Sequence, residues 1–250
     1  TSRSAETCAG WRARGWEASQ LDVADPQAAE EFFRHFPALS VVVDSVPPIR
    51  AGGDPATGAR SIAAALAGSA VRQVIYLSTT GVFGVRDGSC VDESTPPAPW
   101  NPQGEARLLC EEAYRASGVA TCALRLPAIY GPDRGLVHSL RSGSYRLIGS
   151  GESWTNRIHV DDLVTVLERA ISAASLPPVL CVSDDCPTRA REVVEFLCAR
   201  EGLPLPVSIT EQEAIGAGAY TMLSNQRVQN LLMKRTLGVS LRYPSFREGM

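Results

Sequence analysis

The stretch from Val71 to Gly84 constrains the fold of this chain more than any other. It reads Val-Arg-Gln-Val-Ile-Tyr-Leu-Ser-Thr-Thr-Gly-Val-Phe-Gly, so a short apolar run is followed by three hydroxyl side chains and a turn. Such a run is typical of a strand buried on both faces in the middle of a parallel sheet. Because open α/β sheets bind ligands beyond the carboxyl ends of their strands, we expect Ser78, Thr79 or Thr80 to face an active-site crevice.

Buried-strand patterns alternate with helical patterns along the rest of the chain. Residues 39–46 and 120–126 are apolar runs like the first one, and residues 58–70 and 104–117 have helical character. This alternation is the signature of βαβ units with right-handed crossovers. It predicts an α/β fold built on a parallel sheet.

The composition argues against several kinds of partner and ligand. The net charge of −3 gives no electrostatic reason to expect nucleic acid or an anionic membrane surface as a partner. No apolar run approaches the roughly 18 residues that span a bilayer. The seven cysteines form no C-x-x-C pair and the three histidines stand apart from them, so we expect no metal site and reduced thiols in a cytoplasmic protein.

Five motifs occur in the order in which they stand in a known superfamily. They are Tyr76–Gly84, Asp92–Pro96, Arg125–Pro132, Arg157–Leu163 and Leu237–Val239. On these motifs the chain resembles the extended short-chain dehydrogenase/reductases, the NAD-dependent epimerase/dehydratase family. The resemblance implies a Rossmann-type doubly wound parallel sheet with a small C-terminal substrate lobe. It places an NAD(P)-binding core in residues 1–150 and a mixed region with the substrate lobe in residues 151–250.

The resemblance also implies a role for Thr79. In this family, a Ser or Thr at the matching position hydrogen-bonds the substrate oxygen at which hydride chemistry occurs. The alternative is that Ser78, Thr79 and Thr80 only satisfy backbone groups next to the strand end. Family order singles out Thr79 as the substrate-binding hydroxyl.

The catalytic Tyr-x-x-x-Lys of the family is replaced in this chain. The matching segment is Pro102-Gln-Gly-Glu-Ala-Arg-Leu108, with Gln103 at the tyrosine position and Arg107 at the lysine position. The family's chemistry needs a phenol whose pKa is lowered by a cation, which an amide cannot supply. A guanidinium can reach ribose hydroxyls, but it does not copy a lysine point charge. This departure resembles the YeeZ-like subgroup of atypical family members, to which we assign the chain.

The dinucleotide fingerprint of the family, a Gly-x-x-Gly-x-x-Gly turn that cradles the pyrophosphate at a helix N-terminus, does not occur in the sequence. Residues 1–4 resemble the loop after the family's second strand. We therefore expect an N-terminal truncation that removes the first strand-helix-strand unit, and weak dinucleotide binding by residues 1–250 alone.

The resemblance places further residues at the cofactor. Arg3 stands where it would meet an adenosine 2′-phosphate, which favours NADP over NAD, with a solvated surface arginine as the alternative. The other positions that match the family's cofactor contacts are Asp22 and Val23 (adenine), Ser45, Val46 and Pro47 (ribose and phosphates) and Pro127 (nicotinamide).

The motif around Arg157 carries three more predictions. Arg157 either meets an anionic group of the substrate or is solvated. His159 is expected to be a packed structural histidine with one ring nitrogen bonded. Asp161 or Asp162 is expected to cap the following helix.

Two functions remain open. The first is an NAD(P)-dependent oxidoreductase or epimerase-like protein that acts on a small carbonyl, hydroxyl or nucleotide-sugar substrate. The second is a non-catalytic dinucleotide-binding sensor or interaction protein. Loss of the Tyr-Lys pair favours the second, whereas retention of Thr79 and Pro127 favours the first. By analogy with the family we expect a possible homodimer, located in the cytoplasm, or in an organelle stroma if a transit peptide has been lost.

Overall fold

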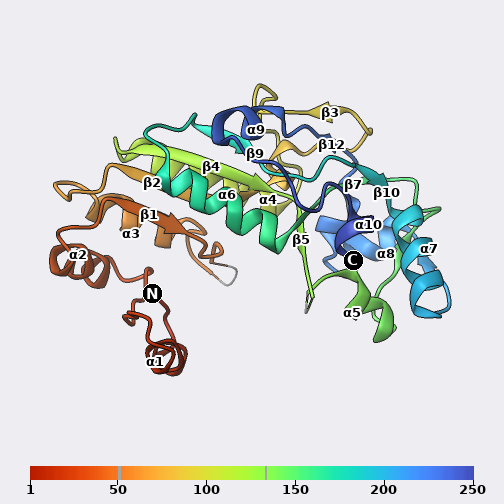
Figure 1. The fold of residues 1–250 in the computed structure, drawn as a ribbon, viewed down its shortest axis with the longest axis horizontal. Helices are drawn as coiled ribbons and strands as arrows, with labels where there is room; N and C mark the ends of the chain where they lie inside the picture. Colours follow the sequence, from red (N-terminus) through yellow and green to blue (C-terminus); the bar gives the residue numbers. More distant parts are fainter. Residues whose placement is uncertain (50–51, 133) are drawn as a thin grey trace. The chain divides into compact units, whose positions relative to one another are not determined.

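The computed structural model describes residues 1–49, 52–132 and 134–250 of the chain. Within these residues the largest sheet has four strands in the order β1-β2-β4-β9 (Figure 1). Strand β1 runs parallel to β2, and β4 runs parallel to β9. The predicted α/β fold around a parallel sheet is therefore confirmed. The strand bounds are Val41–Asp44 (β1), Gln73–Thr79 (β2), Ala120–Leu126 (β4) and Val179–Cys181 (β9).

The Cα positions group the chain into two compact units. The first unit comprises Thr1–Tyr76 and Ala106–Cys122, and the second comprises Leu77–Glu105 and Ala123–Met250. This grouping follows spatial compactness and does not test the predicted division of the chain at residue 150, which stays a prediction.

The first unit contains α1 to α3 and most of α4. The Asp25 carboxylate accepts hydrogen bonds from the N–H groups of Gln27 and Ala28 and so caps α2, as the Asp-Pro pair predicts. Residues 21–25, before α2, form a turn. Asp22 accepts the N–H of Ala24 there, and this local hydrogen bond favours a turn. The helix bounds are Ala5–Ala13 (α1), Pro26–His35 (α2), Thr57–Ala65 (α3) and Pro102–Ala116 (α4).

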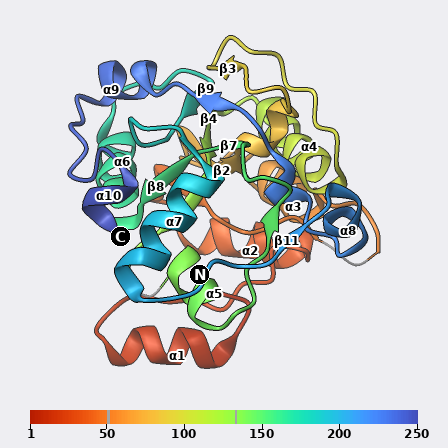
Figure 2. The ribbon, with the colours of Figure 1, turned by 90° about the vertical axis from the view of Figure 1, so that its right-hand side faces the viewer.

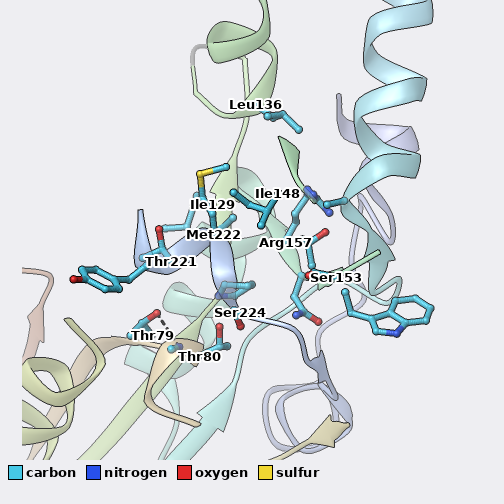
Figure 3. A pocket seen from close by; sticks show the side chains of 18 of the residues that line it. Thr79, Thr80, Ile129, Leu136, Ile148, Ser153, Arg157, Thr221, Met222 and Ser224 are labelled. Carbon is cyan, nitrogen blue, oxygen red and sulfur yellow. Dashed lines mark hydrogen bonds between the residues drawn. The ribbon is translucent and has the colours of Figure 1, made fainter. Parts of the chain in front are cut away.

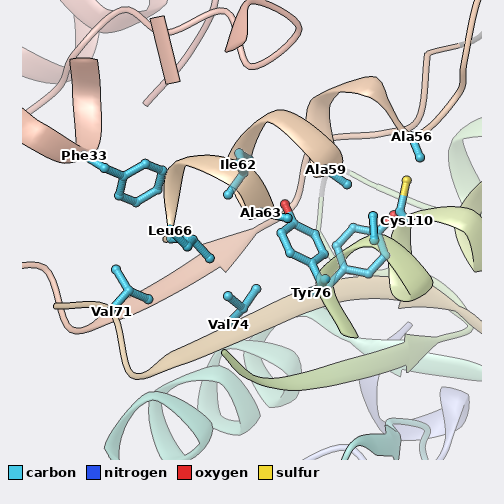
Figure 4. Close-up of a cluster of buried hydrophobic side chains, with 12 residues drawn as sticks. Phe33, Ala56, Ala59, Ile62, Ala63, Leu66, Val71, Val74, Tyr76 and Cys110 are labelled. Carbon is cyan, nitrogen blue, oxygen red and sulfur yellow. The ribbon is translucent and has the colours of Figure 1, made fainter. Parts of the chain in front are cut away.

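An apolar core joins the elements of the first unit (Figure 4). Ile62 of α3 and Leu66, directly after α3, face this core, β2 contributes Val74 and Tyr76, and α2 contributes Phe33. All five side chains are at most 6% exposed. Burial of side chains of this size is the main source of stability in a domain. The strand predicted at the opening motif is thus confirmed as a buried one.

The second unit is made of short strand pairs and helices. Its pairs are β3 (Cys90–Val91) with β12 (Arg227–Val228), β5 (Ala128–Tyr130) with β8 (Arg157–His159), β6 (Leu147–Ile148) with β11 (Ser208–Ile209), and β7 (Trp154–Thr155) with β10 (Thr188–Arg189). Its helices are η1 (Thr80–Phe83), α5 (Leu136–Arg141), α6 (Val160–Ser172), α7 (Ala190–Glu201), α8 (Glu211–Gly216), η2 (Tyr220–Leu223), α9 (Leu231–Leu237) and α10 (Phe246–Gly249). Helices α5, α7 and α10 gather around a second apolar cluster near the C-terminus (Figure 2).

The junction of β8 and α6 differs from its prediction in one respect. His159, and not Asp161 or Asp162, caps α6, because its Nδ1 accepts the N–H of Asp161 at 3.1 Å. The carboxylate of Asp162 instead accepts the N–H groups of Arg242 and Tyr243 at 2.8 and 2.9 Å. His159 is 2% exposed, so its prediction as a packed, singly bonded histidine is confirmed.

A search of the described residues finds no helix with the length and apolar character needed to cross a membrane.

Candidate functional site

A cavity of about 610 Å³ lies within the second unit (Figure 3). Its lining includes Thr79 at the end of β2, Gln103 in the first turn of α4 and Pro127 in the turn between β4 and β5. Three residues that are far apart in the sequence, and that were singled out separately, therefore line one pocket. A concave site beyond a strand end is where an α/β fold binds its ligand.

Thr79 has both a local and a ligand-facing role available to it. Its Oγ1 accepts the N–H of Gly81 at 3.2 Å and so caps η1. This hydrogen bond is the alternative role considered above, in which the hydroxyl satisfies a backbone group next to the strand end. Among the described residues no acceptor takes the proton of its hydroxyl, and the half-buried side chain lines the cavity. The neighbouring Thr80 also lines the cavity, whereas Ser78 does not. The hydroxyl of Thr79 is thus free to donate a hydrogen bond to a ligand.

Gln103 is held at the pocket by the way α4 begins. The side chain of Asn101 accepts the N–H groups of Gln103 and Gly104 at 3.1 and 3.0 Å, which satisfies two free donors of the first turn. A Cβ atom at Gly104 would lie 2.8 Å from the carbonyl oxygen of Gly81, so α4 approaches η1 as closely as only glycine permits. The Gln103 side chain itself is exposed.

Arg107 lies in the first unit, where it contacts a different phenol. Its Nη1 donates to the hydroxyl of Tyr76 at 3.0 Å and lies 3.5 Å from the carbonyl oxygen of Val46. Tyr76 is fully buried, and this burial raises the pKa of its phenol in spite of the nearby guanidinium. This pair cannot replace the Tyr-Lys pair, because a phenol so placed neither reaches a substrate nor ionises near neutrality.

A buried hydrogen bond that the sequence did not reveal orders the end of β1. The hydroxyl of Tyr114 donates to Asp44 at 2.6 Å, and the other oxygen of Asp44 accepts the N–H of Val46 at 2.8 Å. Burial raises the pKa of Asp44, although both of these hydrogen bonds lower it. The ring of Tyr114 is fully buried. The pair fixes the backbone of Val46, one of the predicted cofactor contacts.

The other predicted cofactor contacts of the first unit are mostly exposed. Arg3 is exposed, and its carbonyl oxygen accepts a hydrogen bond from the Gln20 side chain at 3.0 Å. Val23 packs against the apolar core of the first unit. The remaining residues of this set, Asp22, Ser45, Val46 and Pro47, are exposed. Their contacts with a dinucleotide stay predictions.

Aromatic side chains, none of which was predicted as a site residue, form much of the cavity wall. They are Trp100, Tyr130, Tyr145, Trp154 and Tyr220. Burial raises the pKa of the Tyr130 and Tyr145 phenols, so neither is tuned to exchange a proton near neutrality. The described lining residues include no Asp, Glu, His, Lys or Cys side chain. Across the described ranges, no three His, Cys, Asp or Glu side chains are grouped so that they could hold a metal ion.

The comparison with protein families decides the relationship of the chain. Residues 1–179 match the model of the NAD dependent epimerase/dehydratase family. The chain belongs to this family. Membership confirms the resemblance on which the sequence predictions rested.

Individual relatives are distant. The chain is 26% identical over 196 residues to the Epimerase family protein SDR39U1 homolog, chloroplastic, of Arabidopsis thaliana, covering 72% of this chain and 54% of that protein. It is 28% identical over 120 residues to a UDP-glucose 4-epimerase of Streptococcus mutans, covering 42% of this chain and 36% of the enzyme. The chain thus spans about half, or less, of the length of these family members.

A solved structure from Silicibacter pomeroyi DSS, described as a functionally unknown conserved protein, resembles the chain over nearly all of its length. The TM-score is 0.78 at 33% identity, covering 99% of this chain and 86% of the other. This similarity supports the fold of the whole described chain, and it brings no activity with it.

Proposed function

We propose that the protein is an NAD(P)-dependent oxidoreductase or epimerase-like enzyme that acts on a small carbonyl, hydroxyl or nucleotide-sugar substrate. The observation that carries the proposal is the convergence of Thr79, Gln103 and Pro127 on one cavity. The family is described as NAD dependent, and the S. mutans relative is a UDP-glucose 4-epimerase. Both facts support a hydride-transfer reaction on a substrate of this kind.

The residues of the first unit fit part of a dinucleotide. The segment Ser45–Pro47 is exposed, and Asp44 holds its Val46 N–H in place. The Arg107 guanidinium next to the Val46 carbonyl offers a cation to ribose or phosphate oxygens. The dinucleotide, when bound, supplies or accepts the hydride. We assign its nicotinamide side to Pro127 and its adenosine side to Asp22 and Val23, with Arg3 favouring NADP.

Thr79 is assigned the substrate oxygen. Its hydroxyl, held by the hydrogen bond from Gly81, donates to the oxygen of the reacting carbonyl or hydroxyl group. An oriented donor of this kind stabilises the charge that develops on that oxygen. Gln103 in the family's tyrosine position can orient the substrate through its amide, but it cannot exchange the proton.

The proton is therefore exchanged with water. A positioned general acid or base typically contributes about 10²–10⁴-fold to a rate, so this enzyme is expected to turn over slowly compared with family members that keep the Tyr-Lys pair. Slow turnover is expected because the Gln103 amide cannot exchange a proton, and because the raised pKa values of Tyr130 and Tyr145 keep these phenols protonated.

The proposal is tested on the full-length protein. Fluorescence titration with NADPH and NADH measures binding and cofactor preference, and a screen of carbonyl compounds then measures oxidation of the bound cofactor. Thr79→Val should abolish oxidation with little change in cofactor affinity, whereas Thr79→Ser should retain it. Turnover that is unchanged in Thr79→Val would contradict the assigned role.

A second function is favoured by one observation, the lack of any near-neutral titratable side chain among the described lining residues. It is a dinucleotide-binding sensor or interaction protein without turnover. Tight NADPH or NADH binding combined with no oxidation across a broad substrate screen would favour this alternative.

A further inference from the structure

Arg157 is the buried charge of the pocket. It lies on β8, it is 7% exposed, and its side chain is among those that line the cavity (Figure 3). Within the described part of the chain, its guanidinium makes no hydrogen bond and no ion pair, and its Cζ lies 5.9 Å from the centre of the Phe246 ring. At 7% exposure it is not an arginine of the outer surface, and the space beside it is the cavity. A guanidinium carries five N–H donors, and a buried one is normally paired with a carboxylate or phosphate.

The nearest opposing charge compensates Arg157 only in part. The N–H of Asp184 donates to the carbonyl oxygen of Arg157 at 2.7 Å, so the two residues are neighbours, but their side chains form no ion pair. The carboxylate of Asp184 instead accepts the N–H of Cys186 at 3.3 Å. Burial raises the pKa of Asp184 to about 7, so near neutrality this carboxyl group is only partly ionised.

The other charged side chain of the cavity lining is positive, like Arg157. Arg134 is the other charged side chain among the described lining residues, and no acidic side chain accompanies the two arginines. Low-dielectric walls that include Trp154 and Tyr145 strengthen the field of these cations inside the cavity. A neutral ligand would leave the buried guanidinium uncompensated, whereas an anionic ligand would pair with it.

We propose that Arg157 binds an oxyanion of the substrate, either a carboxylate or a phosphate, so that the pocket selects anionic substrates. The planar fork of the guanidinium suits both groups, because each presents two oxygens for parallel N–H···O bonds. The assignment rests on the proposed function, since it names the substrate class of the same pocket, but it requires neither a bound cofactor nor turnover.

The experiment uses the tryptophans of the pocket wall, Trp100 and Trp154, as reporters. The protein is titrated without cofactor against inorganic phosphate, D-glucuronate and neutral D-glucose, and binding is followed by tryptophan fluorescence. Glucuronate and glucose differ in a carboxylate, so their comparison isolates the charge. Phosphate against glucuronate tells which oxyanion the site prefers.

We expect at least one of the two anions to bind about tenfold or more tightly than glucose. Arg157→Met, which keeps side-chain length but removes the charge, should lose this difference, and Arg157→Lys should keep part of it. Asp184→Asn, which removes the partial counter-charge and keeps an acceptor for Cys186, should bind the anion several-fold more tightly.

Equal binding of anions and glucose by the wild-type protein would overturn the proposal, as would unchanged anion binding in Arg157→Met. If Arg157→Met does not fold, Asp184→Asn decides the matter, because an anion site at Arg157 predicts tighter binding in this variant and unchanged binding would overturn the proposal. Failure of the proposed function shows itself separately, as absent NADPH oxidation by a protein that still binds the anion through Arg157.

Discussion

Replacing Tyr114 by Phe tests how the end of β1 is held. The substitution removes the hydroxyl that donates to Asp44 at 2.6 Å and leaves the ring in the core of the first unit. Tyr114 is fully buried and Asp44 is 5% exposed, so water does not replace the lost donor without disturbing the packing. A hydrogen bond to a charged group contributes about 1.5–3 kcal/mol, and a neutral one about 1 kcal/mol.

The loss should depend on pH in a defined direction. The pKa of Asp44 is raised in the folded protein, so its contribution to stability is greatest below the ordinary carboxyl pKa and falls as the pH rises through the raised value. The Tyr114 hydroxyl opposes this fall because it stabilises the carboxylate. Tyr114→Phe should therefore reduce the free energy of unfolding by about 1 kcal/mol near pH 3.5, below the ordinary carboxyl pKa, and by up to about 2 kcal/mol near pH 8.

Urea denaturation followed by circular dichroism at the two pH values measures both losses. Tyr243→Phe is the matched control, because the Tyr243 hydroxyl lies 3.5 Å from a carboxylate oxygen of Asp161 at an exposed position. The control should change stability by less than about 0.5 kcal/mol at either pH. A loss in Tyr114→Phe that is no larger than in the control, or that is the same at both pH values, would refute the reasoning.

Three further predictions concern the pocket and its supports. Gly104→Ala should lower the free energy of unfolding by about 1–3 kcal/mol, because the new Cβ would meet the backbone of η1. Gly10→Ala is the control: it has open space around it and should be neutral or slightly stabilising in the same urea denaturation assay. The double substitution Gln103→Tyr with Arg107→Lys should raise kcat by about tenfold or more in an NADPH oxidation assay, and an unchanged kcat would argue against a missing proton relay. The wild-type protein should lose stability, by a few kcal/mol in order of magnitude, between about pH 4 and about pH 7, because the pKa of Asp184 is raised to about 7 in the folded protein. Asp184→Asn should remove the part of that loss that Asp184 causes, measured by pH-dependent urea unfolding.

The parts of the fold that were predicted from the sequence depend on local patterns. The apolar run before Ser78 predicts the buried strand β2, which is confirmed, and Asp25 followed by Pro26 is a local pattern typical of a helix start, which α2 shows. The cap of α6 was missed because three polar residues, His159, Asp161 and Asp162, stand close together, and local sequence does not say which side chain folds back. The Asp162 carboxylate instead accepts hydrogen bonds from backbone N–H groups some eighty positions further along the chain, which local sequence does not reveal.

Family order is what marks the residues of the candidate site in the sequence, and their roles stay predictions. Thr79, Gln103 and Pro127 were identified in this way, and they line one cavity. The aromatic wall was missed because residues such as Trp100, Trp154 and Tyr220 come from separate loops and short strands, with no periodicity that joins them. The burial of Arg157 was equally hidden, since a strand of three residues does not reveal which of its faces is covered.

The role of Thr79 in hydride transfer is the central claim, and single-turnover oxidation of bound NADPH tests it most directly. The full-length protein, loaded with NADPH, is mixed with carbonyl substrates that carry a carboxylate or phosphate, and loss of the cofactor's fluorescence is recorded. We predict slow oxidation in the wild-type protein and in Thr79→Ser, and none in Thr79→Val. Oxidation by Thr79→Val at the wild-type rate would contradict the claim.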